Sequence, residues 1–279
     1  MMALIAVITC MADTTIDANH PYAYGANTGW INALGNVTHG AVIGQAYCTG
    51  YVYSANCGWI CLGSGPTNGW QYSNLLDSDW GVNHDGAGNL SGYAYGANIG
   101  WITFEQTHGQ PHVDLLTANL GGYAWSANTG WISLSNAQAY VRTETIDAGP
   151  DSDTDGIPDA WEYGYTNVLT VLADGGADSD GDGISDVDEY GTDTDPFDAN
   201  DYLWVTLDKA GGTTNTLSWP TRPTRNYRLQ STTNLVSIEW TISDVGLLHD
   251  ETGTLTVQDE PVTNSPVRFY RVNAVLPLE

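Results

Sequence analysis

The stretch Tyr22-Ala-Tyr-Gly-Ala-Asn-Thr-Gly-Trp-Ile31 decides the fold of the N-terminal half, because the chain repeats it three more times. The later copies are Tyr51-Val-Tyr-Ser-Ala-Asn-Cys-Gly-Trp-Ile60, Tyr93-Ala-Tyr-Gly-Ala-Asn-Ile-Gly-Trp-Ile102 and Tyr123-Ala-Trp-Ser-Ala-Asn-Thr-Gly-Trp-Ile132. Spacings of 29, 42 and 30 residues place an insertion before the third copy, around Gly69–Trp80. Such periods are typical of an architecture built from one supersecondary unit.

Each copy predicts a β-hairpin. Ala-Asn-x-Gly lies between two aromatic, β-prone runs, and its glycine can adopt the left-handed conformation that a bulged turn requires. A further strand precedes the third and fourth hairpins, at Trp80–His84 and His112–Leu115, so the unit is a three-stranded meander. We predict an array of four such repeats over residues 13–146. Its geometry stays open among a closed barrel, a prism and a propeller-like ring.

Alternation along the strands assigns the side chains to two faces. In the third copy Leu90 and Ala94 share a small aliphatic face, opposite Tyr93 and Tyr95. Three interpretations of the aromatic face stay open: a second packing layer between repeats, platforms for sugar rings flanked by Asn and Ser, and a surface for a protein polymer. The candidate ligand-binding residues on this face are Trp30, Trp59, Trp101 and Trp131.

Two twelve-residue segments, 151–162 and 178–189, carry acidic residues at positions 1, 3, 5, 9 and 12, glycine at position 6 and isoleucine at position 7. Ca²⁺ takes six to eight oxygen ligands at roughly 2.3–2.6 Å, and a loop of this pattern supplies them from carboxylates and the position-7 carbonyl. We therefore predict two calcium sites. The ligands are Asp151, Asp153, Asp155, Ile157, Asp159 and Glu162 in one loop, and Asp178, Asp180, Asp182, Ile184, Asp186 and Glu189 in the other.

The surroundings of these loops depart from an EF-hand. Pro150 follows a glycine and cannot end an entering helix cleanly, while each loop leads into a brief helix, around residues 159–165 and 185–190. The segment 147–201 resembles the thrombospondin type 3 calcium repeats of secreted bacterial proteins, and a dockerin is the nearest alternative. The resemblance implies that calcium makes this segment a stiff, protease-resistant spacer.

Residues 202–279 predict a small β-sandwich, because six short alternating runs are separated by turn residues. Leu217-Ser-Trp219 followed by Tyr227-Arg-Leu229, and Phe269-Tyr-Arg-Val272, resemble fibronectin type III strands, which implies a display or spacing role. The arginines of this part either bind an acidic surface, the chain's own linker included, or form a solvated strand face. The predicted fold class is all-β, with a short calcium-binding linker between two β-rich parts.

The net charge of −26 is distributed unevenly. Residues 1–141 contain no Lys or Arg, and residues 142–201 hold eighteen of the 33 acidic residues. Such a chain repels phosphate backbones, which argues against a nucleic-acid partner. No segment reaches the roughly 20 apolar residues that a transmembrane helix needs.

Export is indicated by two features. Residues 1–12 are typical of the end of a secretory h-region cleaved after Ala12, although without a positive n-region a truncated start or an apolar first strand is the alternative. Carboxylate-rich calcium loops also suit extracellular calcium concentrations. A disulfide from Cys48 to Cys57 or Cys61 is disfavoured by the strand offset, and Cys48 is predicted to be a core residue. We expect an extracellular or cell-surface location.

The sequence contains no motif of a catalytic nucleophile, zinc protease or phosphate-binding loop. Gly109 and Pro111 rule out the helix that would align the neighbouring histidines, and the turn carboxylates Asp79, Asp85, Glu105 and Asp114 stay open as candidates for glycoside hydrolysis. We expect no catalysis. The leading hypothesis is an exported calcium-binding structural or adhesive protein, and the alternative is a carbohydrate-binding module. The expected partners are calcium ions and an extracellular polysaccharide or cell-surface protein.

Overall fold

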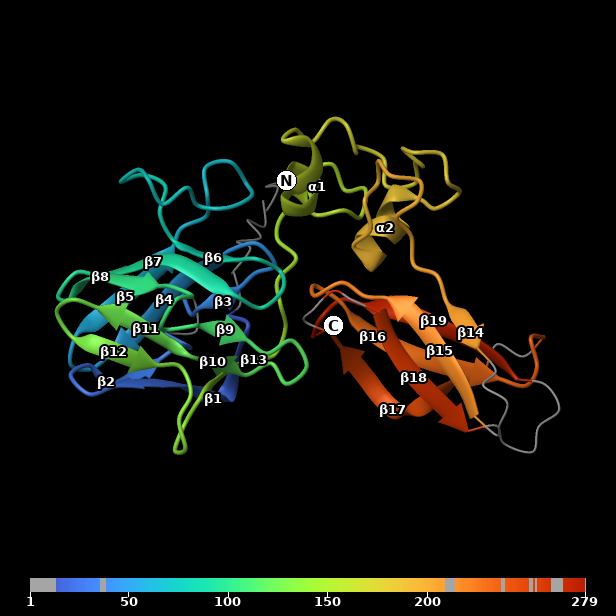
Figure 1. The fold of residues 1–279 in the computed structure, drawn as a ribbon. Coiled ribbons are helices and arrows are strands. Elements are labelled where there is room, and N and C mark those ends of the chain that lie inside the picture. Colours follow the sequence, from blue (N-terminus) through green and yellow to red (C-terminus); the bar gives the residue numbers. More distant parts are fainter. Residues whose placement is uncertain are drawn as a thin grey trace, which may run out of the picture.

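The computed structural model describes residues 14–35, 39–208, 214–236, 239–250, 253, 255–261 and 268–278. The predicted signal segment 1–12 lies outside these residues. The described chain is β-rich with two short helices, α1 (Asp159–Thr166) and α2 (Asp186–Thr192), which confirms the all-β class and the brief helices of the linker. Figure 1 shows the N-terminal strands at one side, the C-terminal strands at the other, and the helices in the segment between them.

The four predicted hairpins form one closed sheet. They pair in chain order, and β12 also pairs with β1, so eight strands make a continuous ring. The hairpin strands are β1 (Ile16–Gly25), β2 (Gly29–Asn32), β4 (Cys48–Ser54), β5 (Gly58–Gly63), β7 (Leu90–Gly96), β8 (Gly100–Phe104), β11 (Tyr123–Ser126) and β12 (Gly130–Ser133). Closure leaves these strands without a free edge.

The N-terminal part is therefore not a row of hairpin repeats: of the three geometries left open by the sequence, the closed barrel is the one formed. The hairpins are not separate repeat units, because each one hydrogen-bonds through both of its strands to its neighbours in an eight-stranded closed barrel. Three short strands, β3, β6 and β13, join the barrel sheet, whereas β9 and β10 form a separate two-stranded sheet; the predicted third strand of the meander is present as β6 beside β7. The short strands are β3 (Val42–Ile43), β6 (Val82–His84), β9 (His112–Val113), β10 (Leu120–Gly121) and β13 (Val141–Thr143).

The C-terminal part consists of two three-stranded sheets, ordered β14-β15-β18 and β17-β16-β19. Leu217 and Trp219 of one sheet and Tyr227 and Leu229 of the other are buried in a single hydrophobic cluster. The strands are β14 (Thr206–Asp208), β15 (Thr214–Pro220), β16 (Asn226–Thr232), β17 (Thr241–His249), β18 (Leu255–Pro261) and β19 (Phe269–Val275). Neither helix of the described chain has the length and apolarity that crossing a membrane requires.

The same register occurs at all four contacts between neighbouring hairpins. In each, the isoleucine of Gly-Trp-Ile lies opposite the serine or glycine that ends the first strand of the next hairpin. The pairs are Ile31 with Ser54, Ile60 with Gly96, Ile102 with Ser126 and Ile132 with Gly25. The barrel therefore repeats one local geometry four times around its circumference.

The asparagines of the Ala-Asn-x-Gly turns join the hairpins further. Each side-chain amide donates a hydrogen bond to the backbone carbonyl of residue x in the turn of a neighbouring hairpin, and the four bonds form a closed cycle. They run from Asn27 to Thr129 (3.0 Å), from Asn56 to Thr28 (3.2 Å), from Asn98 to Cys57 (3.0 Å) and from Asn128 to Ile99 (3.0 Å). These side-chain amides therefore stabilise the closed barrel.

Small and branched aliphatic side chains fill the barrel. The outgoing strands contribute Ala23, Ala94 and Ala124, and the returning strands contribute the repeated isoleucines, all buried in one cluster. Cys48 is 1% exposed, as predicted for a core residue. The described cysteines Cys48, Cys57 and Cys61 are free, in agreement with the strand-offset argument. An apolar cavity of about 70 Å³ remains between these side chains.

We predict that Asn98→Ala destabilises the barrel more than Asn56→Ala. Thr28 O keeps a second donor, the Ser54 hydroxyl at 2.7 Å, when Asn56 is truncated. Cys57 O, in contrast, accepts from no described side-chain N–H or O–H group other than Asn98. The expected loss in the free energy of unfolding is about 1 kcal/mol for Asn98→Ala, and smaller for Asn56→Ala. Urea unfolding followed by tryptophan fluorescence measures both, and equal losses would contradict the role of the second donor.

Candidate calcium centre and aromatic surface

The aspartates at positions 1, 3 and 5 converge in each predicted calcium loop. One carboxylate oxygen from each of Asp151, Asp153 and Asp155 lies within 4.8 Å of the others, and Asp178, Asp180 and Asp182 repeat the arrangement. The turn that brings them together depends on the glycine at position 6. Gly156 and Gly183 have φ angles of 99° and 98°, a left-handed conformation that favours glycine. Their N–H groups donate to the first aspartate of each loop, at 3.1 and 2.9 Å.

The glutamate at position 12 of each loop is fully buried on a helix. Glu162 lies on α1 and Glu189 on α2, both 0% exposed. Neither oxygen of Glu162 has a hydrogen-bond partner within the described chain, and the same holds for one oxygen each of Glu189, Asp155 and Asp180. Burying a carboxylate without a partner costs several kcal/mol unless a metal or a proton compensates. These orphaned oxygens therefore fit a bound cation.

The raised pKa values of the two glutamates also fit a bound cation. Burial, with smaller contributions from Asp153 and Asp155, raises the pKa of Glu162 to about 8. Burial and the neighbouring Asp180 raise the pKa of Glu189 to about 7. In each loop partly exposed aspartates surround a buried glutamate, so a divalent cation would offset both their repulsion and the desolvation cost of the glutamate. A hard oxygen donor set of this kind suits calcium.

The aspartates at position 9 bind the serines at position 2 of their own loops. Asp159 accepts hydrogen bonds from Ser152 N at 2.7 Å and Ser152 Oγ at 2.6 Å. Asp186 does the same with Ser179, at 3.0 and 2.8 Å. Both carboxylates thus fix the start of their loops, and their ligation of calcium stays a prediction. The serines were missed from the sequence, although serine at position 2 of both loops was the available signal.

The isoleucines at position 7 take part in the same turns through their backbone. The N–H of Ile157 donates to Asp155 Oδ1 at 2.9 Å, and that of Ile184 donates to Asp182 Oδ1 at 2.7 Å. The Ile157 side chain is 0% exposed and anchors its loop. Ligation by the two isoleucine carbonyls stays a prediction.

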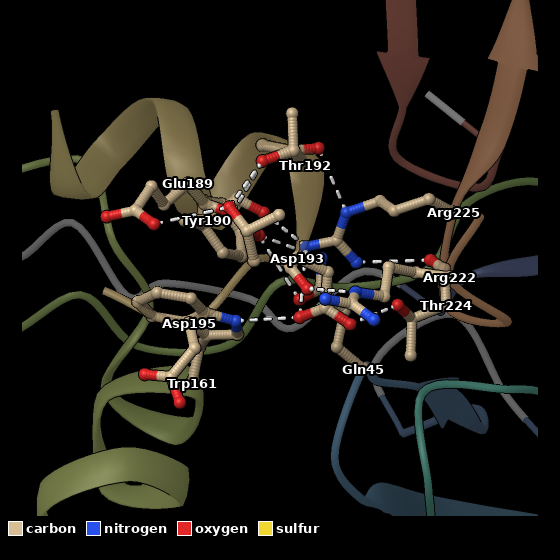
Figure 2. Close-up of polar contacts among 12 residues, drawn as sticks. Gln45, Trp161, Glu189, Tyr190, Thr192, Asp193, Asp195, Arg222, Thr224 and Arg225 are labelled. Carbon is tan, nitrogen blue, oxygen red and sulfur yellow. Dashed lines mark hydrogen bonds and ion pairs between the residues drawn. The ribbon is translucent and has the colours of Figure 1, made fainter. Parts of the chain in front are cut away.

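Helix α2 also holds the C-terminal sheets, through arginines that bind its carbonyl end. Arg225 is 4% exposed; its guanidinium donates to Gly191 O at 3.0 Å and to Tyr190 O, and it lies over the Tyr190 ring. Arg222 donates to Asp193 O at 3.0 Å and pairs with Asp201. Figure 2 shows both arginines directed at this helix end. Of the two alternatives for the arginines, binding to the chain's own acidic linker is therefore the one realised by Arg222 and Arg225.

The same cluster contacts the barrel and the first calcium loop. Gln45, from the barrel, donates to the Tyr190 hydroxyl at 3.0 Å. Trp161 on α1 donates through its indole N–H to Asp193 Oδ1 at 2.9 Å. Cations are favourable at a helix C-terminus, where the macrodipole is negative. A single short helix thus carries the predicted calcium ligand Glu189 at its middle and the anchor of the C-terminal sheets in its last turn.

The four candidate tryptophans lie on the outside of the barrel. Trp30, Trp59, Trp101 and Trp131 are 49, 43, 47 and 46% exposed. The interpretation of a packing layer in which repeats bury one another's tryptophans is therefore wrong. The physical reason is closure of the barrel: the aliphatic face fills the interior, and no second layer of described residues covers the aromatic face.

Each hairpin presents three exposed aromatic side chains. Tyr24 meets Trp30 with ring centroids 4.9 Å apart, and Tyr53 with Trp59 and Tyr95 with Trp101 repeat this distance. We call the whole set the aromatic belt. It comprises Tyr22, Tyr24, Trp30, Tyr51, Tyr53, Trp59, Tyr93, Tyr95, Trp101, Tyr123, Trp125 and Trp131, between 38 and 49% exposed.

The candidate catalytic carboxylates all accept hydrogen bonds from backbone N–H groups of nearby turns. Asp85 binds the N–H groups of residues 87 and 89, Glu105 those of 107 to 109, and Asp114 those of 116 and 117. Asp79 accepts from Thr67 N and Ser73 N. Each carboxylate thus stabilises a loop.

Comparison with protein-family models, with curated proteins and with solved structures finds no match.

We predict that Glu189→Gln lowers the calcium affinity of the second loop by at least about tenfold, since it replaces a charged oxygen donor by a neutral amide. Asp188→Asn is the matched control, because Asp188 is exposed and neighbours Glu189 on the same helix. Calorimetric calcium titration of the full chain measures both variants. Equal losses in the two would show that net charge, and not coordination, sets the affinity.

We further predict that calcium removal opens residues 150–200 to proteases while the barrel stays folded. Without a cation the crowded carboxylates repel one another, α2 loosens, and the arginine anchor loses its acceptors. Limited proteolysis with and without a chelator, read by mass spectrometry, identifies the cleaved bonds. Cleavage that proceeds at the same rate in calcium and in chelator would contradict this.

Proposed function

We propose that this chain is a non-catalytic, calcium-binding extracellular adhesive protein whose barrel binds a neutral polysaccharide through the aromatic belt. The observation that carries the proposal is the exposure of three tyrosines or tryptophans on every hairpin, with no covering layer among the described residues. Contiguous exposed apolar surface of this kind marks interaction sites in soluble proteins. Tyrosine and tryptophan combine an apolar body with a polar tip, which suits a ligand that is partly hydrated.

Charge narrows the ligand class. The hairpins of the barrel contain no Lys or Arg, since residues 1–141 lack both; Arg142 on β13 is the one basic residue of the segment 13–146, and the whole chain carries −26. Anionic ligands are repelled by such a surface. Neutral sugar rings present C–H faces that stack on indole and phenol rings, and hydroxyls that hydrogen-bond at the rim. A neutral polysaccharide therefore fits better than an acidic one, and a cell-surface protein is the alternative partner.

The acidic loops and the C-terminal sheets would serve as a spacer and display module for the barrel. The two acidic loops resemble thrombospondin type 3 repeats, and the C-terminal strands resemble fibronectin type III strands, so we extend the roles that these resemblances imply to this chain. Calcium in the loops would fix α2, and α2 holds the C-terminal sheets through Arg222 and Arg225. The belt would then be presented from a stiff, calcium-dependent support at the cell surface or in the extracellular matrix.

The test is affinity electrophoresis of the full chain in calcium, in gels containing hydroxyethylcellulose, laminarin, a soluble mannan or anionic alginate. We expect at least one neutral polysaccharide to retard the protein and to quench its tryptophan fluorescence saturably, and alginate to do neither. A variant with Trp30, Trp59, Trp101 and Trp131 all changed to Ala should migrate unretarded. Absence of retardation and of quenching across the panel would overturn the polysaccharide proposal.

A further inference from the structure

The insertion between the second and third hairpins builds a groove on one side of the aromatic belt. The groove has a volume of about 380 Å³ and is lined by Asn74, Asp77 and Trp80 from the insertion and by Tyr93 and Trp101 from the third hairpin. Only this contact between hairpins carries the longer connection, as the 42-residue spacing shows against 29 and 30 elsewhere. In Figure 1 the insertion forms the loops that rise from the barrel above β7.

Two indole rings form a corner in this groove. Trp80 meets Trp101 with ring centroids 5.1 Å apart and planes at 89°. Trp30 and Trp59 pair with tyrosines of their own hairpins, and Trp131 lies opposite Trp125 of its own hairpin; among the described residues, only Trp101 meets an indole from outside its hairpin. Trp101 is 47% exposed, so its ring offers a platform while Trp80 stands beside it as a wall.

The wall is held rigidly by buried polar groups. The Asp79 carboxylate is 6% exposed and accepts hydrogen bonds from Thr67 N at 3.2 Å and Ser73 N at 3.0 Å. The buried Tyr72 hydroxyl donates to Cys48 O at 3.0 Å. A side chain at Gly81 would place its Cβ 2.3 Å from the Tyr72 ring, so only glycine lets this ring lie in place. Such preorganisation lowers the entropic cost of binding a ligand.

The rim of the groove carries apolar and acidic groups that the fold does not use. Leu75 and Leu76 are 86 and 64% exposed. Asp77 follows them at the tip of a tight turn, which the bond from Asp79 N to Leu76 O closes at 3.1 Å. Its carboxylate is exposed and makes no hydrogen bond to another described residue. A free carboxylate beside an aromatic platform suits a ligand with hydroxyl donors and an apolar ring face.

We propose that this groove is the subsite that binds one or two pyranose rings of a neutral polysaccharide, with Trp101 as the platform, Trp80 as the side wall and Asp77 as the acceptor of hydroxyl hydrogen bonds. The inference rests on the proposed function and assigns it to one place on the belt. The volume lies at the low end of the range of about 300–1,000 Å³ for small-ligand sites. A protein partner would need about 800 Å² of surface on each side, far more than this corner offers.

The chain supplies matched controls for the test. Trp59 occupies the position of Trp101 in the second hairpin, has the same 4.9 Å pairing with a tyrosine, and is 43% exposed. Ser78 is exposed in the same turn as Asp77. The variants are Trp101→Ala against Trp59→Ala, and Asp77→Ala against Ser78→Ala, all in the full chain with calcium. The probes are cellohexaose, laminarihexaose and mannohexaose, and the readout is the dissociation constant by calorimetry.

We expect at least one hexasaccharide to bind, with Trp101→Ala weakening it at least about tenfold and Trp59→Ala less than about twofold. Asp77→Ala should weaken it about threefold or more, and Ser78→Ala should leave it unchanged. Asp77 is exposed at a loop tip, so we expect Asp77→Ala to fold. The Asp77→Ala measurement therefore still tests the proposal if Trp101→Ala unfolds.

The contrary outcomes are distinct. Equal weakening by Trp101→Ala and Trp59→Ala, with no effect of Asp77→Ala, would overturn the groove and leave polysaccharide binding to the whole belt. If no hexasaccharide binds and no polysaccharide retards the chain, both proposals are overturned. Self-association of the chain can be measured by sedimentation. If the chain self-associates and Leu75→Ser and Trp101→Ala abolish this, the groove is a contact between copies of the chain, and the sugar assignment is overturned.

Discussion

The pairing of β12 with β1 closes the sheet, and the placing of the barrel side chains depends on it. Each contact between hairpins has only two paired residues on either strand, so the cycle of turn asparagines supplies further hydrogen bonds where the backbone ladder is short. Once the ring is closed, only the small aliphatic face fits inside. The aromatic face is left outside, and its availability for binding is a consequence of closure.

A second constraint is the burial of two glutamates, Glu162 and Glu189, which lie in the first turns of short helices and are both fully buried. Glu189 is the middle residue of α2, and the carbonyls of the two residues that follow it, Tyr190 and Gly191, bind Arg225. The charge balance of the second calcium loop and the attachment of the C-terminal sheets therefore depend on one seven-residue helix. Trp161 extends this dependence to the first loop through Asp193. The linker thus joins the barrel, both acidic loops and the C-terminal sheets through contacts of this one helix.

The sequence predicted well wherever the deciding interactions are local. The turns followed from Asn-x-Gly, the strands from alternation, and the helices from the calcium loops, since each pattern determines its own backbone. The position-9 aspartates show where that reasoning stops. Carboxylates at five spaced positions look equivalent in the sequence, yet Asp159 and Asp186 accept hydrogen bonds from the serines at position 2. Which arginines would meet the acidic linker was likewise undecided.

By itself the sequence determined the four hairpins, their two faces, the two acidic loops and the sign of the charge, because each depends on residues close together in the chain. Only the tertiary structure decided that the hairpins close on themselves, that the aromatic face is the outer one, and that the insertion places Trp80 against Trp101. These outcomes depend on contacts between residues far apart in the chain. Either face of an alternating strand can be buried, and the sequence of the strand does not determine which partner covers it.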